Sequence, residues 1–407
     1  MGAILAQGSR QHSSLMESAL RLPHITSAVA CHTGYKNAVG AASRTLRLGW
    51  IEANIVSPKV FVFSDNNDNR EVLALDLRKR TWSPMAPFPR EDLNYRSFYQ
   101  VGDTVYVLAK RNLEDVNVVI FKYEMRRNIW TEIKEMEDFR NGFSRFSKST
   151  VMVGEDLYVF DCPDDNDENQ FIPDTEPILL KKYNFASGAL SSTGLPLPFD
   201  QFGDLFAQFR DFSFMAIESN GFIYTTDCTD WSNLGADNLP VSLMLDPGTR
   251  AWTFCPDAPT FFHRAVKFEN DIAIVGGINF SVLEEDDLSQ DTDDYFDVVD
   301  IGAQGHSQGH RPRYHGLDPY GQQVWRLSKN SQAWTRLPSM STGRYYPGAV
   351  VVEGSIHVFG GNDGRIALDS AEELDLTTGV WKPLPRMPHK MPRKCYAFLL
   401  SGTQKSP

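Results

Sequence analysis

Several features that direct proteins to particular functions are missing from this sequence. Its five cysteines are odd in number and contain no C-x-x-C pair, which argues against a disulfide framework or a structural zinc site and favours a reducing compartment. No run of eighteen apolar residues occurs, so no segment is predicted to span a membrane. Basic residues are also outnumbered, 40 to 52 by acidic ones, and the net charge of −12 would repel the phosphates of a nucleic acid. We expect neither a membrane nor a nucleic acid as partner.

Motifs for catalysis and for cofactor binding are missing as well. No G-x-S-x-G sequence marks a nucleophile, and the acidic runs lack the ordered spacing of a calcium-binding loop. His306, His310 and His315 lie close together, but a Gly-rich segment gives them no fixed geometry for a metal ion. The sequence therefore predicts no catalytic residue, no cofactor and no metal site.

What the sequence does contain is a series of short strands separated by turns, and the clearest set lies between Arg344 and Arg393. Glycines at Gly354 and Gly379 mark two of the turns, and Gly360-Gly361 ends a strand. The predicted strands are Ala349–Val352, Ile356–Phe359, Ala371–Leu376 and Val380–Leu384. One such sheet cannot bury both of its faces alone, so the pattern indicates a protein built from repeats of it.

Incomplete copies of this pattern occur upstream. The spacing Trp-x5-Met is found at Trp130/Met136, Trp334/Met340 and Trp381/Met387. Trp82 and Trp252 keep only the tryptophan, and Leu190 stands at the corresponding position of another copy. With double glycines at Gly276-Gly277 and Gly360-Gly361 and a period of about fifty residues, the chain resembles the kelch repeat family, of which it is a divergent member.

The resemblance implies an all-β fold, a kelch-type β-propeller with four antiparallel strands in each blade. The first copy offers only three strands, at Lys59–Phe63, Glu71–Leu75 and Thr81–Trp82, whereas Tyr396–Leu400 is a spare strand at the other end of the chain. We therefore predict that the C-terminal strand closes the first blade, which removes exposed sheet edges and brings the number of blades to six.

Three regions are predicted along the chain. Residues 1–57 are an Arg- and Ser-rich, acid-poor extension that we expect to be disordered or loosely helical, with organellar targeting as the alternative to a cytoplasmic location. Residues 58–402 form the propeller, and residues 403–407 form a tail. An insertion at 280–322 in blade five is acidic in its first half and rich in Gly and His in its second, and we expect most of 281–315 to be poorly ordered.

Two sets of charged residues suggest a binding face. Acidic segments fall between the second and third strands of five blades, at Asp65–Asp68, Glu114-Asp115, Asp161–Glu168, Asp227–Asp237 and Glu284–Asp300. Arginines recur just before the innermost strands, at Arg90, Arg140, Arg210, Arg344 and Arg393, with Thr260 replacing the arginine in blade five. One interpretation is that the arginines, with Tyr345 and Tyr346, hold an acidic side chain of a partner that is basic overall. The alternative is that they join the blades.

The function predicted from this pattern is a non-catalytic interaction module, a monomer that binds a protein or peptide on the loop face of the propeller as a substrate receptor or scaffold. Related receptors of ubiquitin ligases carry helical BTB and BACK regions, for which residues 1–57 are too short. The alternative is a kelch-like propeller enzyme of the copper radical oxidase or sialic acid epimerase type. Such an oxidase would need a Cys–Tyr crosslink beside Tyr and His ligands.

Overall fold

The computed structural model describes residues 57–64, 71–110, 118–136, 150–159, 179–196, 212–230, 241–260, 263–277, 321–329, 331, 333–391 and 394–401. The chain divides into two compact units, of which Lys59–Leu400 is the larger. The other unit, residues 1–58 with 401–407, lies almost wholly outside the described residues, as does the predicted insertion at 280–322. Within the described segments, no helix is long and apolar enough to cross a membrane.

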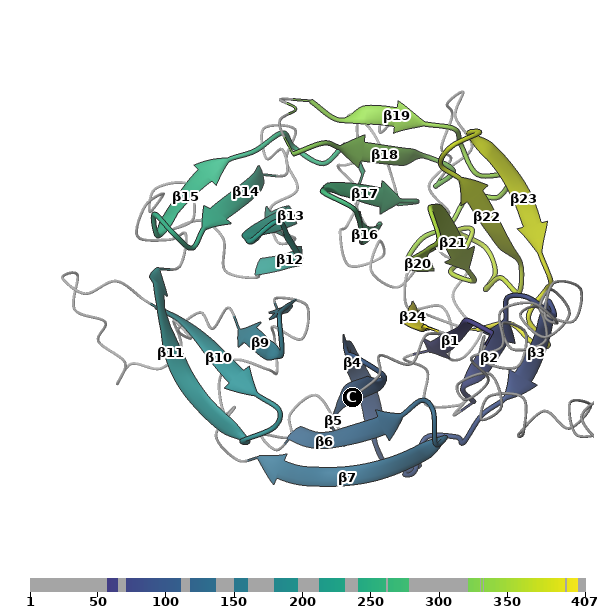
Figure 1. Ribbon diagram of the computed structural model, residues 1–407, viewed down its shortest axis with the longest axis horizontal. Helices are drawn as coiled ribbons and strands as arrows, with labels where there is room; N and C mark the ends of the chain where they lie inside the picture. Colours follow the sequence, from purple (N-terminus) through teal and green to yellow (C-terminus); the bar gives the residue numbers. More distant parts are fainter. Residues whose placement is uncertain are drawn as a thin grey trace, which may run out of the picture. The chain divides into compact units, whose positions relative to one another are not determined.

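The larger unit consists of six four-stranded antiparallel sheets arranged around a common axis, as Figure 1 shows. Each sheet is a blade, and its strands are named from the innermost one outward. Blades one and two are β24 (Cys395–Leu400), β1 (Lys59–Ser64), β2 (Leu73–Asp76) and β3 (Thr81–Pro84), then β4 (Asn94–Val101), β5 (Thr104–Lys110), β6 (Val118–Glu124) and β7 (Ile129–Met136). Blades three and four are β8 (Thr150–Val153), β9 (Asp156–Val159), β10 (Leu179–Asn184) and β11 (Ala189–Pro196), then β12 (Phe212–Ser219), β13 (Phe222–Asp230), β14 (Val241–Asp246) and β15 (Ala251–Phe254). Blades five and six are β16 (Arg264–Phe268), β17 (Asp271–Val275), β18 (Val324–Leu327) and β19 (Thr335–Leu337), then β20 (Gly348–Val352), β21 (Ser355–Phe359), β22 (Ala371–Asp375) and β23 (Val380–Leu384).

The predicted propeller is confirmed, including its closure. Strand β24 pairs with β1 in antiparallel register, from Lys59 opposite Leu400 to Ser64 opposite Cys395. The N-terminal part of the propeller is thus held in a sheet with its C-terminal strand, which covers the inner edge of β1.

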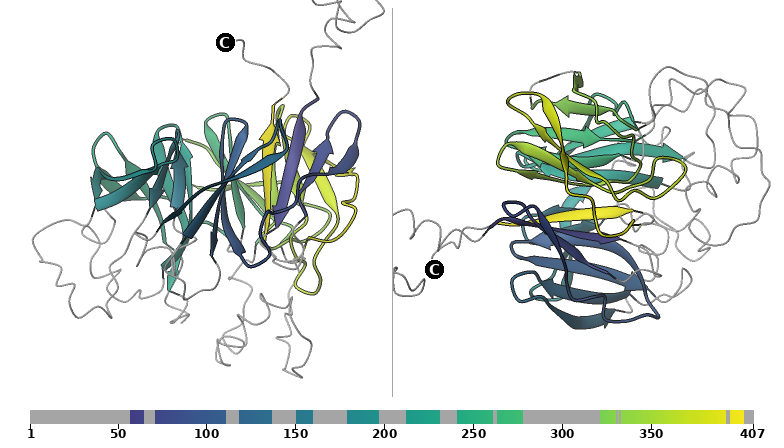
Figure 2. Two further views of the ribbon diagram at one scale, coloured as in Figure 1. Left: turned by 90° about the horizontal axis from the view of Figure 1, so that it is seen from below. Right: turned by 90° about the vertical axis from the view of Figure 1, so that its right-hand side faces the viewer.

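The two faces of the ring follow from the strand order. Because strands within a blade are antiparallel, every inner strand begins on the face that carries the connections between second and third strands. We call this the loop face. Short turns join the first to the second and the third to the fourth strands on the opposite face, and Figure 2 shows the sheets from the side.

The strand bounds place four of the acidic segments in the connections predicted for them, although the segments themselves lie outside the described part of the chain. The fifth segment begins within a strand, because β13 continues to Asp230 and the predicted loop therefore starts later than Asp227. A polar end of a strand gives the same local composition as a loop, which explains the difference.

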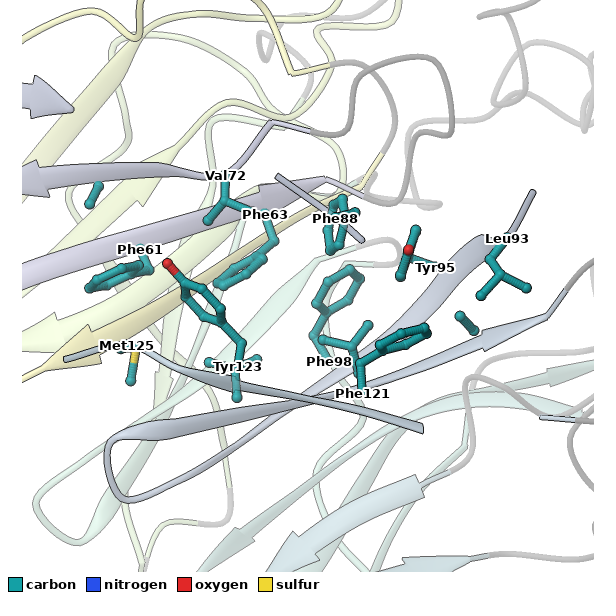
Figure 3. Close-up of a cluster of buried hydrophobic side chains, with 14 of the residues drawn as sticks. Phe61, Phe63, Val72, Phe88, Leu93, Tyr95, Phe98, Phe121, Tyr123 and Met125 are labelled. Carbon is teal, nitrogen blue, oxygen red and sulfur yellow. The ribbon is translucent and has the colours of Figure 1, made fainter. Parts of the chain in front are cut away.

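The hydrophobic core lies at the seams between blades. Between blades one and two, Phe61 and Phe63 of β1 meet aromatic residues of the next blade, including Phe88, Phe98 and Tyr123 (Figure 3). The ring of Phe63 has its centroid 5.6 Å from that of Phe98 and 5.7 Å from that of Tyr123. Aromatic pairs at such distances add to the stabilisation from burial. Each blade therefore relies on its neighbour to cover one of its faces.

The repeat tryptophans fasten these seams by a recurring hydrogen bond. In each case the indole Nε1–H donates to a carbonyl four residues after the corresponding tryptophan of the preceding blade. The bonds are Trp130 to Ala86, Trp334 to Pro256, Trp381 to Pro338 and Trp82 to Pro385, at 2.8–2.9 Å. The bond from Trp82 to Pro385 joins blade one to blade six, where the ring closes. The tryptophans that recur in the sequence are therefore the residues that form hydrogen bonds between neighbouring blades.

Blade three, which has Leu190 in place of the tryptophan, changes this arrangement. The position four residues after Leu190 is Gly194, and its carbonyl accepts a hydrogen bond from the guanidinium of Arg250 in blade four. Trp252 of blade four is fully buried. At this carbonyl, Arg250 in the turn before β15 thus ties blade four to blade three.

Candidate functional site

Four half-buried side chains gather on the loop face where the inner strands of blades five, six and one begin, and we call them the axial cluster: Arg264, Tyr346, Lys394 and Tyr396. Arg264 is the first residue of β16. Its Nε donates to Pro347 O at 3.2 Å and its Nη2 donates to Cys395 O at 2.8 Å. One edge of its guanidinium therefore binds main-chain oxygens of the two following blades.

Aromatic rings support both cations of the axial cluster. The guanidinium carbon of Arg264 lies 4.6 Å from the ring centroid of Tyr396, and Lys394 Nζ lies 4.8 Å from that of Tyr346. Both distances are typical of cation–π contacts. Tyr346 has a left-handed backbone, with φ of 48°, and its carbonyl accepts from Cys395 N at 3.1 Å. The bond to β24 helps to hold a conformation that a tyrosine seldom adopts.

Arg344, one of the five arginines predicted to contact a partner, is fully buried. Its side chain binds only its own blade: Nε and Nη2 donate to Glu372 Oε1, Nη1 donates to Gly360 O and Ser370 O, and Nη2 also donates to Ser370 Oγ, all within 3.3 Å. Burial lowers the pKa of Arg344, and the charge of Glu372 opposes that shift. All five N–H donors are engaged, so none is left for a partner.

The backbone of Arg344 joins blade six to blade five. Its N–H donates to Gly321 O at 3.0 Å, and its carbonyl accepts from Gly277 N at 2.9 Å. A Cβ at Gly276 would lie 2.3 Å from Arg344 O, which is why a glycine is required at that strand end. Arg344 therefore has a structural role, but it differs from the alternative stated from the sequence, because its side chain binds within its own blade and only its backbone reaches blade five.

Thr260, which replaces the arginine in blade five, has an equivalent role. It is fully buried, and its hydroxyl donates to Gly276 O at 3.0 Å, as Arg344 Nη1 does to Gly360 O. In both blades the repeat position thus binds the carbonyl of the first glycine of the pair. This shared partner explains how a threonine can occupy a position held by arginine in other copies.

The other predicted site residues differ in their surroundings. Arg90 forms a two-bond pair with Asp92, at 3.0 and 2.6 Å, and lies 3.7 Å from Glu132 of the outer strand β7. It therefore faces carboxylates of its own chain. Arg140, Arg210 and Arg393 lie outside the residues that the structure describes, so the predicted ring of arginines can be followed only at Arg90 and Arg344.

Tyr345 and Tyr346, the two tyrosines predicted to anchor a partner, are both half-buried on the loop face. Tyr345 forms an isolated β-bridge with Asn362, in the connection between β21 and β22. Asp363 and Asn362 hold this connection in a tight turn, since their side chains accept from the N–H groups of Gly364, Arg365 and Ile366 at 2.7–2.9 Å. Ile366 is 50% exposed at this turn.

A pocket of about 90 Å³ lies between blades four and five, away from the axial cluster, and is lined by residues including Tyr224, Cys255 and Lys329. Burial, with a smaller contribution from Asp257, raises the pKa of the Cys255 thiol to about 12. The thiol stays protonated near neutral pH and is a poor nucleophile there. Among the described residues no group of three His, Cys, Asp or Glu could hold a metal ion, and His306, His310 and His315 are not described.

Sequence reasoning missed Arg264. The signal available was a charged residue at the first position of an inner strand, four residues after Thr260, where blade six has Gly348 and blade two has Asn94. Its partners lie 83 and 131 residues away in sequence, at Pro347 and Cys395. Repeat spacing alone cannot show which carbonyls a long side chain will reach.

Comparison with known proteins found one family motif and similar proteins. The kelch motif matches residues 343–388, which contain Arg344, Gly360-Gly361 and Trp381. An F-box/kelch-repeat protein of Arabidopsis thaliana is 43% identical over 54 residues, which are 12% of this chain and 16% of that protein. The match therefore spans only a small part of that relative's length. The solved structure of YjhT is similar with a TM-score of 0.44 and 13% sequence identity, over 75% of this chain and 87% of that one.

The strand order defines the class of protein: six sheets of four antiparallel strands around one axis, fastened by repeat tryptophans and closed by the last strand, make a six-bladed β-propeller. Within blade six the chain is similar to kelch-repeat proteins, whose motif covers β20 to β23.

Proposed function

We propose that this protein is a non-catalytic interaction module that holds a partner protein or peptide on its loop face. The observation that carries the proposal is the turn of blade six, where Ile366 stands half exposed on a hydrogen-bonded connection next to Tyr345. A single exposed isoleucine is ordinary on a protein surface. A preordered apolar tip beside Tyr345, however, is suited to an interface, since little conformational freedom is lost when it binds.

The chemistry of the partner is proposed from charge. The net charge of −12 and the acidic segments of the strand connections would steer a partner that is basic overall. We propose a receptor or scaffold role in the cytoplasm for a monomeric protein, with the acidic connections acting at long range and the loop face of blade six acting at contact.

A matched pair of substitutions tests this proposal. Ile366 and Val380 are exposed apolar residues of the same blade, 50% and 49% exposed, but Val380 lies beside the β22–β23 turn on the opposite face. The tagged chain is used to capture partners from native lysate, and recovered proteins are quantified by mass spectrometry. Ile366→Asp should reduce recovery of specific partners at least about tenfold, as expected for loss of an interface anchor.

Val380→Asp should leave recovery unchanged, and both variants should melt with the parent because neither side chain is buried in the core. Equal recovery by the two variants, or loss with Val380→Asp alone, would contradict binding on the loop face of blade six.

A further inference from the structure

The guanidinium of Arg264 is held in place but meets no carboxylate among the residues that the structure describes. It forms no ion pair in the part of the chain that the structure describes, and its two hydrogen bonds go to neutral carbonyls. Nη1 takes part in neither bond. Arg344, by contrast, uses all five of its donors and is paired with Glu372. Of these two arginines on adjacent blades, one is fully satisfied and the other is not.

The geometry leaves one edge of Arg264 for a ligand. Nε and Nη2 form the edge that faces Pro347 O and Cys395 O, so the second edge, formed by Nη1 and the other N–H of Nη2, carries parallel donors. Two such donors match the two oxygens of a carboxylate. Tyr396 covers the guanidinium at 4.6 Å and limits its movement. The side chain is thus oriented before any ligand arrives, which reduces the entropy lost on binding.

The surroundings favour an anion at this point. Lys394 adds a second positive charge within the axial cluster, where it lies over Tyr346. The imidazole beside Arg264 is neutral near pH 7, since burial lowers the pKa of His263 to about 4. A half-buried guanidinium bound only to carbonyls gains more from an arriving carboxylate than an exposed one does, because water screens it less.

We propose that Arg264 is the recognition point for a carboxylate of the partner, an aspartate or glutamate side chain that enters the axial cluster and forms a two-bond pair with the free edge of the guanidinium. This inference rests on the proposed function and names the group that is recognised. The acidic group is then a local feature of a partner that is basic elsewhere, since the outer connections are acidic and the axial cluster is cationic.

The experiment uses the full chain and fluorescein-labelled pools of random hexapeptides in which one position is fixed as Glu, Gln or phosphoserine. Binding is followed by fluorescence anisotropy at low and at physiological salt. The parent protein should bind the Glu pool about tenfold to a hundredfold more tightly than the Gln pool, as expected for a paired, charge-assisted hydrogen bond. Arg264→Gln should remove this preference, and Arg264→Lys should keep a part of it, since a lysine retains charge without the fork.

Arg386→Gln is the matched control, because Arg386 is an exposed arginine of blade six that pairs with Asp369 at 2.7 Å. It should leave the preference for Glu unchanged. Arg264→Gln also removes two hydrogen bonds between blades, so all titrations are made well below the lowest melting temperature of the set. Arg264→Lys is a second control, because binding that it retains shows that the preference is not lost through unfolding. A Glu preference that is absent in the parent, or that persists in Arg264→Gln, overturns the inference.

A stronger preference for phosphoserine than for Glu would also overturn it, by showing that the site takes a phosphate. The outcome is separate from that of the proposed function. If the Glu preference fails while Ile366→Asp still abolishes capture, the loop face binds a partner without Arg264. If the preference holds while Ile366→Asp captures normally, the carboxylate site stands and the surface at Ile366 does not.

Discussion

In blade six the kelch residues hold the sheet together and join it to both neighbours, whereas blade three lacks most of them. Blade six has the buried Arg344–Glu372 pair and the bond from Trp381 to Pro338. Blade three has Leu190, 36% exposed, where the tryptophan would be, and its two inner strands have only four residues each.

Blade three is nevertheless held in the ring by its contacts with blade two. Tyr183 and Leu157 of blade three pack with Leu108 and Ile120 of blade two in one buried cluster. The hydroxyls of Tyr99 and Thr150 also meet across this seam, at 2.5 Å. The difference teaches that a propeller can lose the repeat residues of one blade as long as the apolar seam and the closure remain. Stability should therefore be distributed unequally around the ring, as repeat proteins allow.

Removal of the closing strand should have the largest effect. Deletion of residues 394–407 removes β24, leaves β1 without its inner partner and exposes the edge that β24 covers. We expect insoluble protein or loss of the cooperative unfolding transition in urea. Deletion of residues 402–407 alone is the control and should leave the transition unchanged. A truncated chain that unfolds at the same urea concentration as the parent would show that β24 is dispensable.

Substitution of Glu372, within blade six, should have the next largest effect on stability. Glu372→Ala leaves the guanidinium of Arg344 buried without a counter-ion and also removes the acceptor for Ser341, whose N–H and hydroxyl bind Glu372 Oε2 at 2.9 and 2.8 Å. We expect a loss of about 3–5 kcal/mol in the free energy of unfolding, the usual result of breaking a buried pair.

The exposed pair between Arg386 and Asp369 of the same blade provides the control. Asp369→Ala should cost about 0–1 kcal/mol, since solvent screens that pair. If both substitutions cost the same, burial does not distinguish blade six in the way its contacts indicate.

The stability contributed by the seam between blades four and five should depend on pH, whereas that contributed by Arg344 in blade six should not. His263 is fully buried, its Nδ1 donates to Thr260 O at 2.6 Å, and its Nε2 lies 3.0 Å from the hydroxyl of Thr226. Burial lowers its pKa to about 4. The unfolded chain, with an imidazole pKa of about 6.5, then binds more protons than the folded one between these values. Stability present above pH of about 6.5 is lost as the pH falls towards 4, by up to about 3 kcal/mol.

Urea unfolding followed from pH 7 to pH 4.5 measures this effect. His263→Gln, which cannot titrate, should flatten the slope in that range, although it lowers stability at pH 7 by removing a packed ring. Arg344 stays charged over the whole range, so Arg344→Lys should keep the slope of the parent. An unaltered slope in His263→Gln would show that the acid dependence comes from other groups.

The contrast between blades six and three also bears on what can be predicted from sequence. The period and the Trp spacing were enough to predict six blades and the closing strand, because these depend on local strand patterns and on a count of elements. The predicted strands of blade six agree with β20–β23 to within one residue at each end.

The direction of the arginine side chains could not be predicted in this way. Arg344 points into its own sheet, and Arg90 turns to Asp92, two residues along the chain. The regular spacing of the arginines therefore predicted that they share a backbone position in successive blades. It did not predict the direction of their side chains. Arg264 was missed for the opposite reason, because it recurs nowhere and owes its role to carbonyls of two other blades.

The smallest expected effect concerns the tryptophan that blade three lacks. Trp130→Phe removes the bond to Ala86 O at 2.9 Å and should cost about 0.5–1.5 kcal/mol, as for other single hydrogen bonds. The reverse change, Leu190→Trp, would restore the repeat, yet we expect it to gain less than about 0.5 kcal/mol, within the usual range for a surface substitution. Its acceptor by the repeat spacing would be Lys134, which still lies within β7 and pairs with Ile120 there, whereas Ala86 lies beyond the end of β3. Urea unfolding of both variants against the parent measures the two changes. A gain for Leu190→Trp as large as the loss for Trp130→Phe would show that blade three lacks only its indole, and that the seam beside it accepts the repeat bond as readily as any other.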